Sequence, residues 1–308
     1  MSTVKAEDVA YVRFAAPDLG AMRAFLEDFG LAAVESSDSG LYMRGRGSAP
    51  FLHATEFGDP RFVALGLRLS GLADLERLAA AEGVAIAPLA APGGGWMVRL
   101  TDPDGHVIEA VAGQISAEPL AAQAPVPWNS VHDRSRLRAV KRVAAGPARV
   151  QRLGHAVLNV SDFRASERWY KDRFGFITSD EVALSPEVSI GAFLRCDRGE
   201  IPTDHHTLFL MQSPGGPGFN HAAFEVGDLD DLMAGHQHLA SAERQQAWGV
   251  GRHILGSQVF DYWRDPWGHT LEHWTDGDLF TAADGSRTAS LPDLIGVQWG
   301  QAMPPNFG

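Results

Sequence analysis

The chain contains one kind of segment four times, and this internal repetition constrains its fold more than any other feature. Each copy begins with a short apolar stretch, continues with apolar residues at helical spacing, and ends in alternating stretches separated by turn residues. The copies begin at YVRFAAPDL (11–19), ALGLRLSGL (64–72), HAVLNVSDF (155–163) and HAAFEVGDL (221–229). We therefore expect an α+β protein of four βαβββ modules, in which paired modules enclose a cleft.

Cap and turn residues recur at matching places in these copies. In the third copy, a Ser-Asp pair ending at Asp162 precedes the helical segment, which ends at Gly175. The segments RLTDPDGHVIEAV (99–111) and YWRDPWGHTLEHW (262–274) both have the pattern of strand, turn and strand, with Asp-Pro-x-Gly in the turn. Each module is thus predicted as a strand, a helix and about three more strands.

Two histidines and one glutamate occupy equivalent positions of the third and fourth copies. His155 and His221 open matching segments, and Glu272 ends the segment HTLE, whose counterpart HTLF ends at Phe209. If the paired modules enclose a cleft, the three side chains meet there, and Phe209 stands where a fourth ligand would be. Two imidazoles and one carboxylate suit Fe(II), Mn(II) or Zn(II) and leave coordination positions open, as in non-haem Fe(II) oxygenases. A lone histidine on a strand is more often a hydrogen-bonded core residue, but three equivalent positions favour a metal site.

The first half of the chain lacks this set. Tyr11 and Ala64 stand where the second half has its two histidines, and only Glu109 keeps the carboxylate. One carboxylate cannot hold a transition metal, so we expect Glu109 to be structural and the first half to be a degenerate copy.

Bulk properties exclude several classes of protein. With 308 residues, 45% of them hydrophobic and 21% charged, the chain suits two globular domains with sizeable cores. A net charge of −12 argues against a nucleic-acid partner. Cys196 is the single cysteine, so no intrachain disulfide forms. The start MSTVKAEDVA is not an apolar leader and no run reaches transmembrane length, so we expect a cytoplasmic protein without a membrane partner.

Composition also divides the chain. The stretch AEPLAAQAPVP (117–127) is a Pro/Ala-rich linker, and residues 134–152 hold seven of the 26 Lys and Arg. We interpret this basic stretch as a solvated connector rather than an anion-binding strip. The predicted parts are a first domain at 1–115, a linker at 116–148, a second domain at 149–282 with the metal site, and an apolar tail at 283–308. We expect this tail to pack on the body, and it is a candidate cover for the substrate pocket.

The segment GRHILGSQVFDYWRDPWGHTLE (251–272) resembles the signature of the type I extradiol catechol dioxygenases of the vicinal oxygen chelate superfamily. That signature has Gly-x-His, a short spacer, Tyr, two residues, Asp-Pro-x-Gly and then the metal-binding Glu. The organisation in four modules with an active C-terminal pair is also similar, so the resemblance covers nearly the whole chain. The sequence departs at Asp261, where the family usually has an apolar residue.

This resemblance implies a metal-free vicinal-oxygen-chelate domain at 1–115 and a catalytic domain at 149–282. It implies that iron is bound by three residues, which are His155, His221 and Glu272. It also implies catalytic roles for three more, namely His206 as the acid–base residue and His253 and Tyr262 as hydrogen-bonding partners of substrate and oxygen. His205 remains the alternative to His206. We expect His206 and Phe209 to lie on one strand, where alternation places them on opposite faces, so a bulge or strand start at His206 is needed for both to approach the metal.

Residues predicted to contact the substrate are mostly apolar and aromatic. They are Val157, Phe193, His205, Trp248 and Arg252, with Phe209, Phe224 and Trp299 also near the site. Arg252 is a candidate contact for a substrate carboxylate, or it faces away. Among the other histidines, we expect His269 and His273 to face away from the metal, and His236 and His238 to face solvent.

The implied activity is meta cleavage of a substituted catechol in aromatic compound degradation, with both atoms of O₂ inserted at an Fe(II) centre and Mn(II) as the other candidate. The partners are a small aromatic diol and O₂, and we expect a homo-oligomer. Two other classes remain open. A glyoxalase-like isomerase or thiol transferase of the same fold usually has four protein ligands, including a carboxylate where this chain has Phe209. A metal-free binding module of the bleomycin-resistance type lacks the His/His/Glu set.

Overall fold

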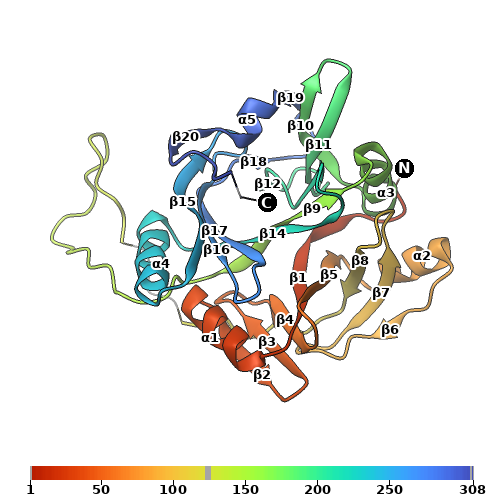
Figure 1. The fold of residues 1–308 in the computed structure, drawn as a ribbon, viewed down its shortest axis with the longest axis horizontal. Coiled ribbons are helices and arrows are strands. Elements are labelled where there is room, and N and C mark those ends of the chain that lie inside the picture. The colour runs from red at the N-terminus through yellow and green to blue at the C-terminus, as the bar shows by residue number, and fades with distance from the viewer. Residues whose placement is uncertain (1, 122–125, 306, 308) are drawn as a thin grey trace.

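The computed structural model describes residues 2–121, 126–305 and 307. Two large β-sheets form its body, one from each half of the chain (Figure 1). Within the described residues, none of the helices has the length and apolar character needed to cross a membrane.

The first sheet comes from the first half of the chain, in the strand order β2-β3-β4-β1-β5-β8-β7-β6. Its elements are β1 (Ala6–Ala16), α1 (Leu19–Phe29), β2 (Ala32–Ser36), β3 (Gly40–Arg44), β4 (His53–Phe57), β5 (Arg61–Leu69), α2 (Leu72–Glu82), β6 (Ala87–Pro88), β7 (Trp96–Thr101) and β8 (Val107–Ala112). The order falls into two equivalent halves, each with one helix and four strands, joined where β1 pairs antiparallel with β5.

The second sheet repeats this plan, in the order β19-β10-β11-β13-β9-β14-β17-β16-β15-β20. Its elements are β9 (Arg152–Val160), α3 (Phe163–Phe174), β10 (Ile177–Ser185), β11 (Val188–Arg195), β13 (Leu208–Gln212), β14 (Gly218–Glu225), α4 (Leu229–Ser241), β15 (Gln245–His253), β16 (Val259–Arg264), β17 (Thr270–Thr275), β19 (Arg287–Ser290), α5 (Leu291–Ile295) and β20 (Val297–Gly300). The short strands β12 (Thr203–Asp204) and β18 (Leu279–Phe280) pair separately. The α+β architecture of four βαβββ modules is confirmed.

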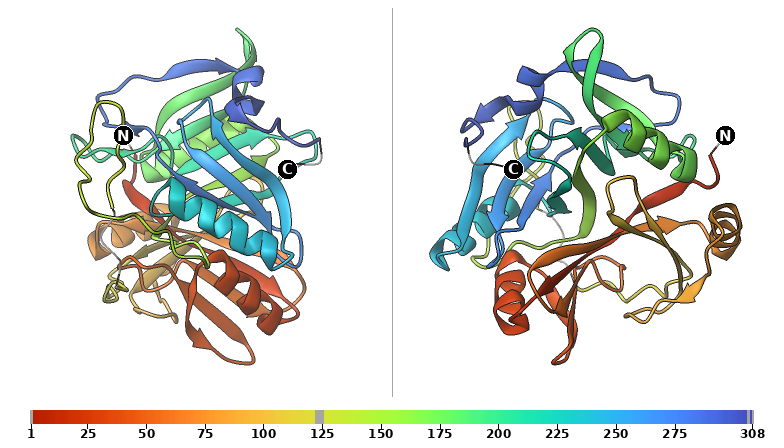
Figure 2. Two further views of the ribbon diagram at one scale, coloured as in Figure 1. Left: turned by 90° about the vertical axis from the view of Figure 1, so that its left-hand side faces the viewer. Right: turned by 45° about the vertical axis from the view of Figure 1, so that its right-hand side comes forward.

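The tail adds a strand to each edge of the second sheet. β19 pairs parallel with β10, and β20 pairs antiparallel with β15. Between them lies α5, so residues 287–300 run across one end of the sheet from edge to edge (Figure 2).

The predicted capping residues begin and end the helices. Asp162 accepts a hydrogen bond from the backbone N–H of Ala165 at 3.0 Å before α3, and Gly175 ends that helix with φ of 68°. Asp18 and Gly30 have the same roles at α1. These local signals therefore give α1 and α3 their bounds.

Alternation along the strands separates the core from the cleft. On β9, Ala156 and Leu158 belong to the main hydrophobic core, whereas His155 and Val157 face the opposite side and line a pocket. The same alternation places Leu208 and Leu210 of β13 in the core. The second sheet thus directs its polar candidates toward its concave face.

The two sheets pack against each other through their convex sides. His273 Nε2 donates to the backbone oxygen of Phe29 at 2.7 Å, and the two rings stack at 3.8 Å between centroids. His269 lies 2.8 Å from Asp265 and packs against Phe14 of the first sheet. Both histidines therefore face away from the cleft, as we expected.

The expectation that His236 and His238 face solvent was wrong. His236 Nδ1 lies 3.1 Å from a buried carboxylate oxygen of Asp261, and His238 Nε2 lies 3.0 Å from Asp28. Helix α4 packs between α1 and β16, so its polar side chains meet acidic partners on both neighbours. Asp28 and Asp261 are far from this helix in the sequence, so the pattern of the helix alone could not predict these contacts.

The start of the linker is bound to the first domain, where the backbone N–H groups of Ala117 and Leu120 donate to the carbonyls of Ser48 and Arg46, each at 2.9 Å. Most of its side chains from 126 to 147 are exposed, and Lys141 pairs with Asp230 at 2.5 Å. The exposure of this later part agrees with a solvated connector, which Lys141 joins to an acidic side chain of the second domain.

Acid sensitivity is expected from a buried histidine of the first sheet. His53 is fully buried and stacks on Phe14, and burial lowers its pKa to about 3. Below pH 6.5 the His53 side chain binds a proton in the unfolded chain but stays neutral in the folded chain. The contribution of His53 to the free energy of unfolding is therefore kept above that pH and decreases as the pH falls. Between pH 7 and pH 5 the buried His53 should lower the free energy of unfolding by about 2 kcal/mol. Urea unfolding at both pH values should show a correspondingly smaller pH dependence for His53→Leu, and an unchanged dependence would contradict the assignment.

Candidate metal centre

Three central strands of the second sheet bring the predicted ligands together. β14 lies between β9 and β17, pairing antiparallel with the first and parallel with the second. His155, His221 and Glu272 each come from one of these strands, and one ligand atom of each lies within 4.8 Å of the others. The Nε2 atoms of His155 and His221 are 3.2 and 3.4 Å from Glu272 Oε2.

The surroundings of Glu272 fit a bound divalent cation. Its carboxylate is fully buried, and neither oxygen has a hydrogen-bond partner among the described residues. A buried carboxylate without such a partner is costly unless a cation neutralises it. Ligand bonds of about 2.1 Å at right angles place donor atoms about 3 Å apart, close to the separations found here. That these residues bind a metal stays a prediction, and the donor set suits one.

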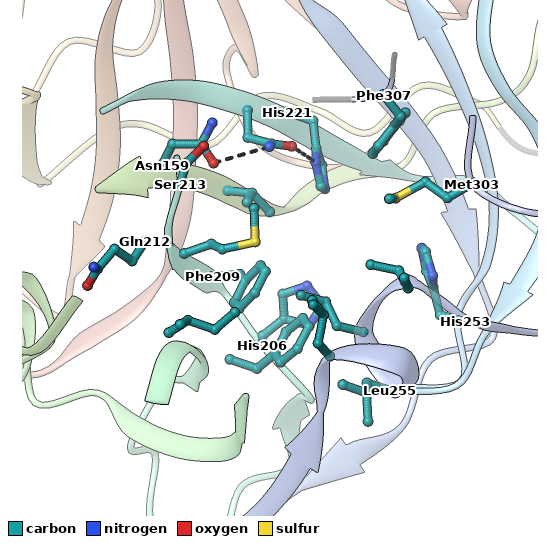
Figure 3. A pocket seen from close by; sticks show the side chains of 18 of the residues that line it. Asn159, His206, Phe209, Gln212, Ser213, His221, His253, Leu255, Met303 and Phe307 are labelled. Atoms are coloured by element: carbon teal, nitrogen blue, oxygen red, sulfur yellow. Dashed lines mark hydrogen bonds between the residues drawn. The ribbon is translucent and has the colours of Figure 1, made fainter. Parts of the chain in front are cut away.

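An amide pair orients one of the imidazoles. His221 Nδ1 lies 2.8 Å from Asn220 Oδ1, and Asn220 Nδ2 donates to Asn159 Oδ1 at 3.2 Å (Figure 3). Because the amide oxygen only accepts, His221 carries its proton on Nδ1 and leaves Nε2 bare toward Glu272. Such a partner on the second ring nitrogen is typical of metal-bound histidine.

The charges at the three residues are those of a metal-binding set. Burial raises the pKa of Glu272, but the contacts with His155 and His221 outweigh it and hold that pKa well below its usual value. Burial lowers the pKa of His221, with Glu272 opposing the effect. A carboxylate faces a neutral imidazole, and both are in the protonation state that a metal requires.

Three further polar side chains surround this group. The ring of His206 lies 4.0 Å from that of His155, centroid to centroid. His253 Nε2 lies 2.9 Å from the hydroxyl of Tyr262 and 3.9 Å from Glu272 Oε1. In Figure 3, His206, His221 and His253 face one common space. The structure thus brings the three predicted catalytic side chains beside the three predicted ligands.

Burial sets the protonation of this second group. The pKa of His206 is lowered well below its usual value by burial, with the neighbouring histidines adding to the effect. Burial lowers the pKa of His253 to about 4. Burial and the Glu272 charge raise the pKa of Tyr262 well above its usual value. The pocket therefore contains two neutral imidazoles and a protonated phenol, which can donate or accept hydrogen bonds without bringing a charge.

His206 reaches the pocket because it precedes a strand. β13 begins at Leu208, so alternation does not govern His206, and the interpretation that it shares one strand with Phe209 was wrong. Phe209 faces the same pocket from β13 and stacks on Phe193 at 4.0 Å between centroids. Both side chains therefore approach the candidate metal position.

Two residues predicted to bind substrate lie elsewhere. His205 sits behind His206, with its Nε2 2.7 Å from Asp180, and does not line the pocket. Arg252 alternates with His253 along β15 and so faces outward. Its guanidinium donates to the Ser257 carbonyl at 2.6 Å and pairs with an exposed acidic side chain, and it does not line the pocket either.

Two of the aromatic residues placed near the site are also outside it. Phe224 belongs to the main core and contacts Phe29 at 5.5 Å between ring centroids. Trp299 is 44% exposed on the edge strand β20, beside Arg252. Neither lines the pocket, because one lies on the convex face and the other at the sheet edge.

The pocket itself has a volume of about 710 Å³ and is mainly apolar. Val157, Phe193 and Trp248 line it as predicted from their place in the sequence. None of the described residues that line it is an aspartate, glutamate, lysine or arginine. The apolar tail, a candidate cover for the pocket from the sequence, contributes to its wall; these side chains are Leu291, Leu294, Ile295, Met303 and Phe307.

Asp261, the departure from the family signature, lies on the other side of the sheet from Tyr262. Its buried carboxylate accepts from Trp263 Nε1 at 2.6 Å and faces His236 of α4. Tyr262 points into the pocket and is 2% exposed. Asp261 therefore has hydrogen-bonding partners on the side of α4, and its polar side chain does not displace Tyr262 from the pocket.

In the first sheet the residue equivalent to Glu272 is Glu109, whose carboxylate is bound by neighbouring side chains. Glu109 accepts from the Tyr11 hydroxyl at 2.8 Å and pairs with Arg13 at 3.1 Å and Arg99 at 2.6 Å. Two guanidinium groups neutralise the carboxylate, which agrees with a structural role.

Comparison with known proteins finds a superfamily match in the second half of the chain. Residues 152–273 match the model of the Glyoxalase/Bleomycin resistance protein/Dioxygenase superfamily. The chain is 28% identical to metapyrocatechase 2 of Cupriavidus necator over 298 residues, covering 94% of this chain and 88% of that protein. It is 28% identical to biphenyl-2,3-diol 1,2-dioxygenase of Pseudomonas sp. (strain KKS102) over 307 residues, covering 92% and 95%.

Solved structures share the fold. An extradiol ring-cleaving dioxygenase from B. fuscum superimposes with a TM-score of 0.81 at 19% identity, over 99% of this chain and 82% of that one. A Mn(II)-bound glyoxalase from Novosphingobium aromaticivorans gives a TM-score of 0.78 at 23% identity, over 98% and 93%. At these identities the likeness establishes the architecture, and the site chemistry rests on the residues described above.

Proposed function

Residues 152–273 of this chain form a domain of the Glyoxalase/Bleomycin resistance protein/Dioxygenase superfamily, and from that premise we propose that the protein is an extradiol ring-cleaving dioxygenase. It inserts both atoms of O₂ into a substituted catechol by meta cleavage at an Fe(II) centre, with Mn(II) as the other candidate. One observation carries the proposal: two imidazoles and one carboxylate converge at an apolar pocket that also holds His206, His253 and Tyr262.

The ligand set leaves room for substrates. His155, His221 and Glu272 would hold the ion, which when bound would supply coordination positions for the catechol and O₂ and the redox chemistry that joins them. Phe209 stands where a fourth protein ligand would be and contributes no donor atom. Its stacking on Phe193 offers the catechol an apolar wall instead.

Three uncharged side chains handle protons and hydrogen bonds. Neutral His206 accepts a proton from a catechol hydroxyl and later returns one to an oxygen derived from O₂. Tyr262, held protonated, shares a hydrogen bond with His253 at 2.9 Å, and the pair directs donors at substrate oxygens. The enclosing tail residues keep bulk water away from these groups.

Anaerobic reconstitution tests the proposal. The protein loaded with Fe(II) and given a catechol and ¹⁸O₂ should form a yellow ring-opened product that carries two labelled oxygen atoms. A protein that binds iron but consumes no O₂ with any of a panel of substituted catechols would overturn it. Turnover of lactoylglutathione with Zn(II) or Ni(II) would instead support a glyoxalase-like isomerase, the alternative that the Mn(II)-bound structural neighbour raises.

The substrate should be a catechol with a neutral, apolar substituent. A carboxylate placed in this pocket would be buried without a charged partner, at a cost of several kcal/mol. We expect kcat/KM for methyl 3,4-dihydroxyphenylacetate to exceed that for the free acid by more than about 100-fold. The two compounds differ in the charge of the substituent and by one ester methyl group, and Met211→Arg should lower the ratio of the two kcat/KM values if charge is the cause. Equal use of acid and ester would contradict this prediction.

We further propose that residues 1–115 are a metal-free copy of the catalytic domain at 149–282. The engagement of Glu109 by two arginines supports this, as does Tyr11 in place of a ligand histidine. The first domain then supports the second through contacts such as Phe29 with His273.

A further inference from the structure

Two adjacent histidines at the pocket face different partners. His206 lines the pocket, whereas His205 lies behind it, and the two are 3% and 1% exposed. Their rings are nearly perpendicular, at 87°, and their Nδ1 atoms are 3.1 Å apart. The chain thus places a second imidazole in hydrogen-bond contact with the first, away from the substrate.

Asp180 holds the far side of His205. It belongs to β10, and its Oδ2 lies 2.7 Å from His205 Nε2. A carboxylate accepts hydrogen bonds, so Nε2 of His205 carries a proton. The result is a chain of three groups, carboxylate, imidazole and imidazole, that runs from β10 to the pocket.

With both imidazoles neutral, the partners fix the direction of each hydrogen bond in this chain. A neutral imidazole has one donor nitrogen and one acceptor nitrogen. With its Nε2 donating to Asp180, His205 accepts at Nδ1, and the donor is the Nδ1–H of His206. His206 therefore has no proton on Nε2, the nitrogen left for the pocket.

Close packing keeps His205 in this orientation. The rings of Phe193 and Phe280 lie 5.1 and 5.6 Å from it, centroid to centroid. Gly256 has φ of 77°, and a Cβ there would meet His205 Nδ1 at 3.0 Å. The backbone at Gly256 thus lies so close to the His205 ring that a larger residue there would crowd it.

From these contacts we propose that Asp180 and His205 are a positioning pair, which fixes His206 with its proton on Nδ1 and a bare Nε2 toward the substrate. The inference rests on the proposed function, because it prepares His206 to accept a proton from a catechol hydroxyl. His205 does not line the pocket and acts through His206.

Nitrogen NMR tests the tautomers without any turnover. The full chain, labelled with ¹⁵N-histidine and loaded with diamagnetic Zn(II), should show His206 as the Nδ1–H form and His205 as the Nε2–H form. Assignment comes from the signals lost in His206→Asn and in His205→Asn. A proton on His206 Nε2 in the wild type would overturn the proposal. Since no dioxygenase activity is needed, this outcome is separate from a failure of the proposed function.

A matched pair of variants tests the consequence for catalysis. In Asp180→Asn the new amide can donate to His205 Nε2, which reverses both hydrogen bonds and puts a proton on His206 Nε2. We expect kcat to fall at least about tenfold, with KM and iron content unchanged. The control is Glu181→Gln, whose side chain pairs with Arg164 on the outer surface and should leave kcat unchanged.

Two results would contradict the pair's role. One is kcat within about twofold of the wild type in Asp180→Asn with the switched tautomer observed. The other is an equal loss in both variants, which would indicate a general effect on β10. If Asp180→Asn does not fold, the wild-type tautomers still decide the question.

Discussion

Replacing Glu272 by alanine is expected to abolish iron retention and to lower turnover more than about 1,000-fold, since even the outer partners of metal ligands typically cost about 10- to 100-fold. The substitution removes the one carboxylate of the set and leaves two imidazoles to hold the ion. Metal analysis after gel filtration measures iron retention, and circular dichroism shows whether the variant folds.

The chain offers a matched control at the equivalent position of the first sheet. Glu109→Ala removes a carboxylate that Arg13 and Arg99 already neutralise, so it should destabilise the first sheet without changing iron content. Iron loss in this control, or retention of iron and activity in Glu272→Ala, would contradict the assignment of the metal site.

His206→Phe is expected to lower kcat by about 100- to 10,000-fold, the usual range for loss of a general acid–base group. Iron content and anaerobic catechol binding should persist, because His206 is not among the three converging ligands. The phenyl ring is of similar size and joins the neighbouring Phe193, which keeps the wall intact. Steady-state kinetics and the absorbance change on catechol binding separate the two effects.

Two comparisons sharpen this result. His269 occupies the repeat-equivalent position but faces Asp265, so His269→Gln should leave kcat unchanged. His205→Phe should lower kcat less than His206→Phe, because His205 acts through its neighbour. Loss of iron in His206→Phe would instead make that residue a ligand, and a larger effect at His205 would reverse the two roles.

Much of the architecture is contained in local and repeated patterns. Asp162 and Gly175 bound a helix because a short side chain caps its first turn and a glycine adopts the left-handed end. His155, His221 and Glu272 were assigned to one cleft because matching places in repeated modules face the same side of one sheet. Patterns that follow the periodicity of a helix or a strand can be predicted from the sequence without knowing any tertiary contact.

Other features depend on contacts between segments far apart in the chain. His206 reaches the pocket because its strand begins two residues later, a boundary that pairing with β9 and β11 decides. His236 finds Asp261 only because α4 packs on β16. The tail closes the pocket because its strands pair with both edges of the sheet.

By itself, then, the sequence determined the four modules, the helix bounds and the convergence of two imidazoles with one carboxylate. Only the tertiary structure decided which of the adjacent histidines meets the substrate, that Arg252 faces away, and what encloses the pocket. The physical reason is that side-chain periodicity and capping act over a few residues, whereas strand bounds, buried hydrogen-bond partners and cavity walls are created by segments that meet only on folding.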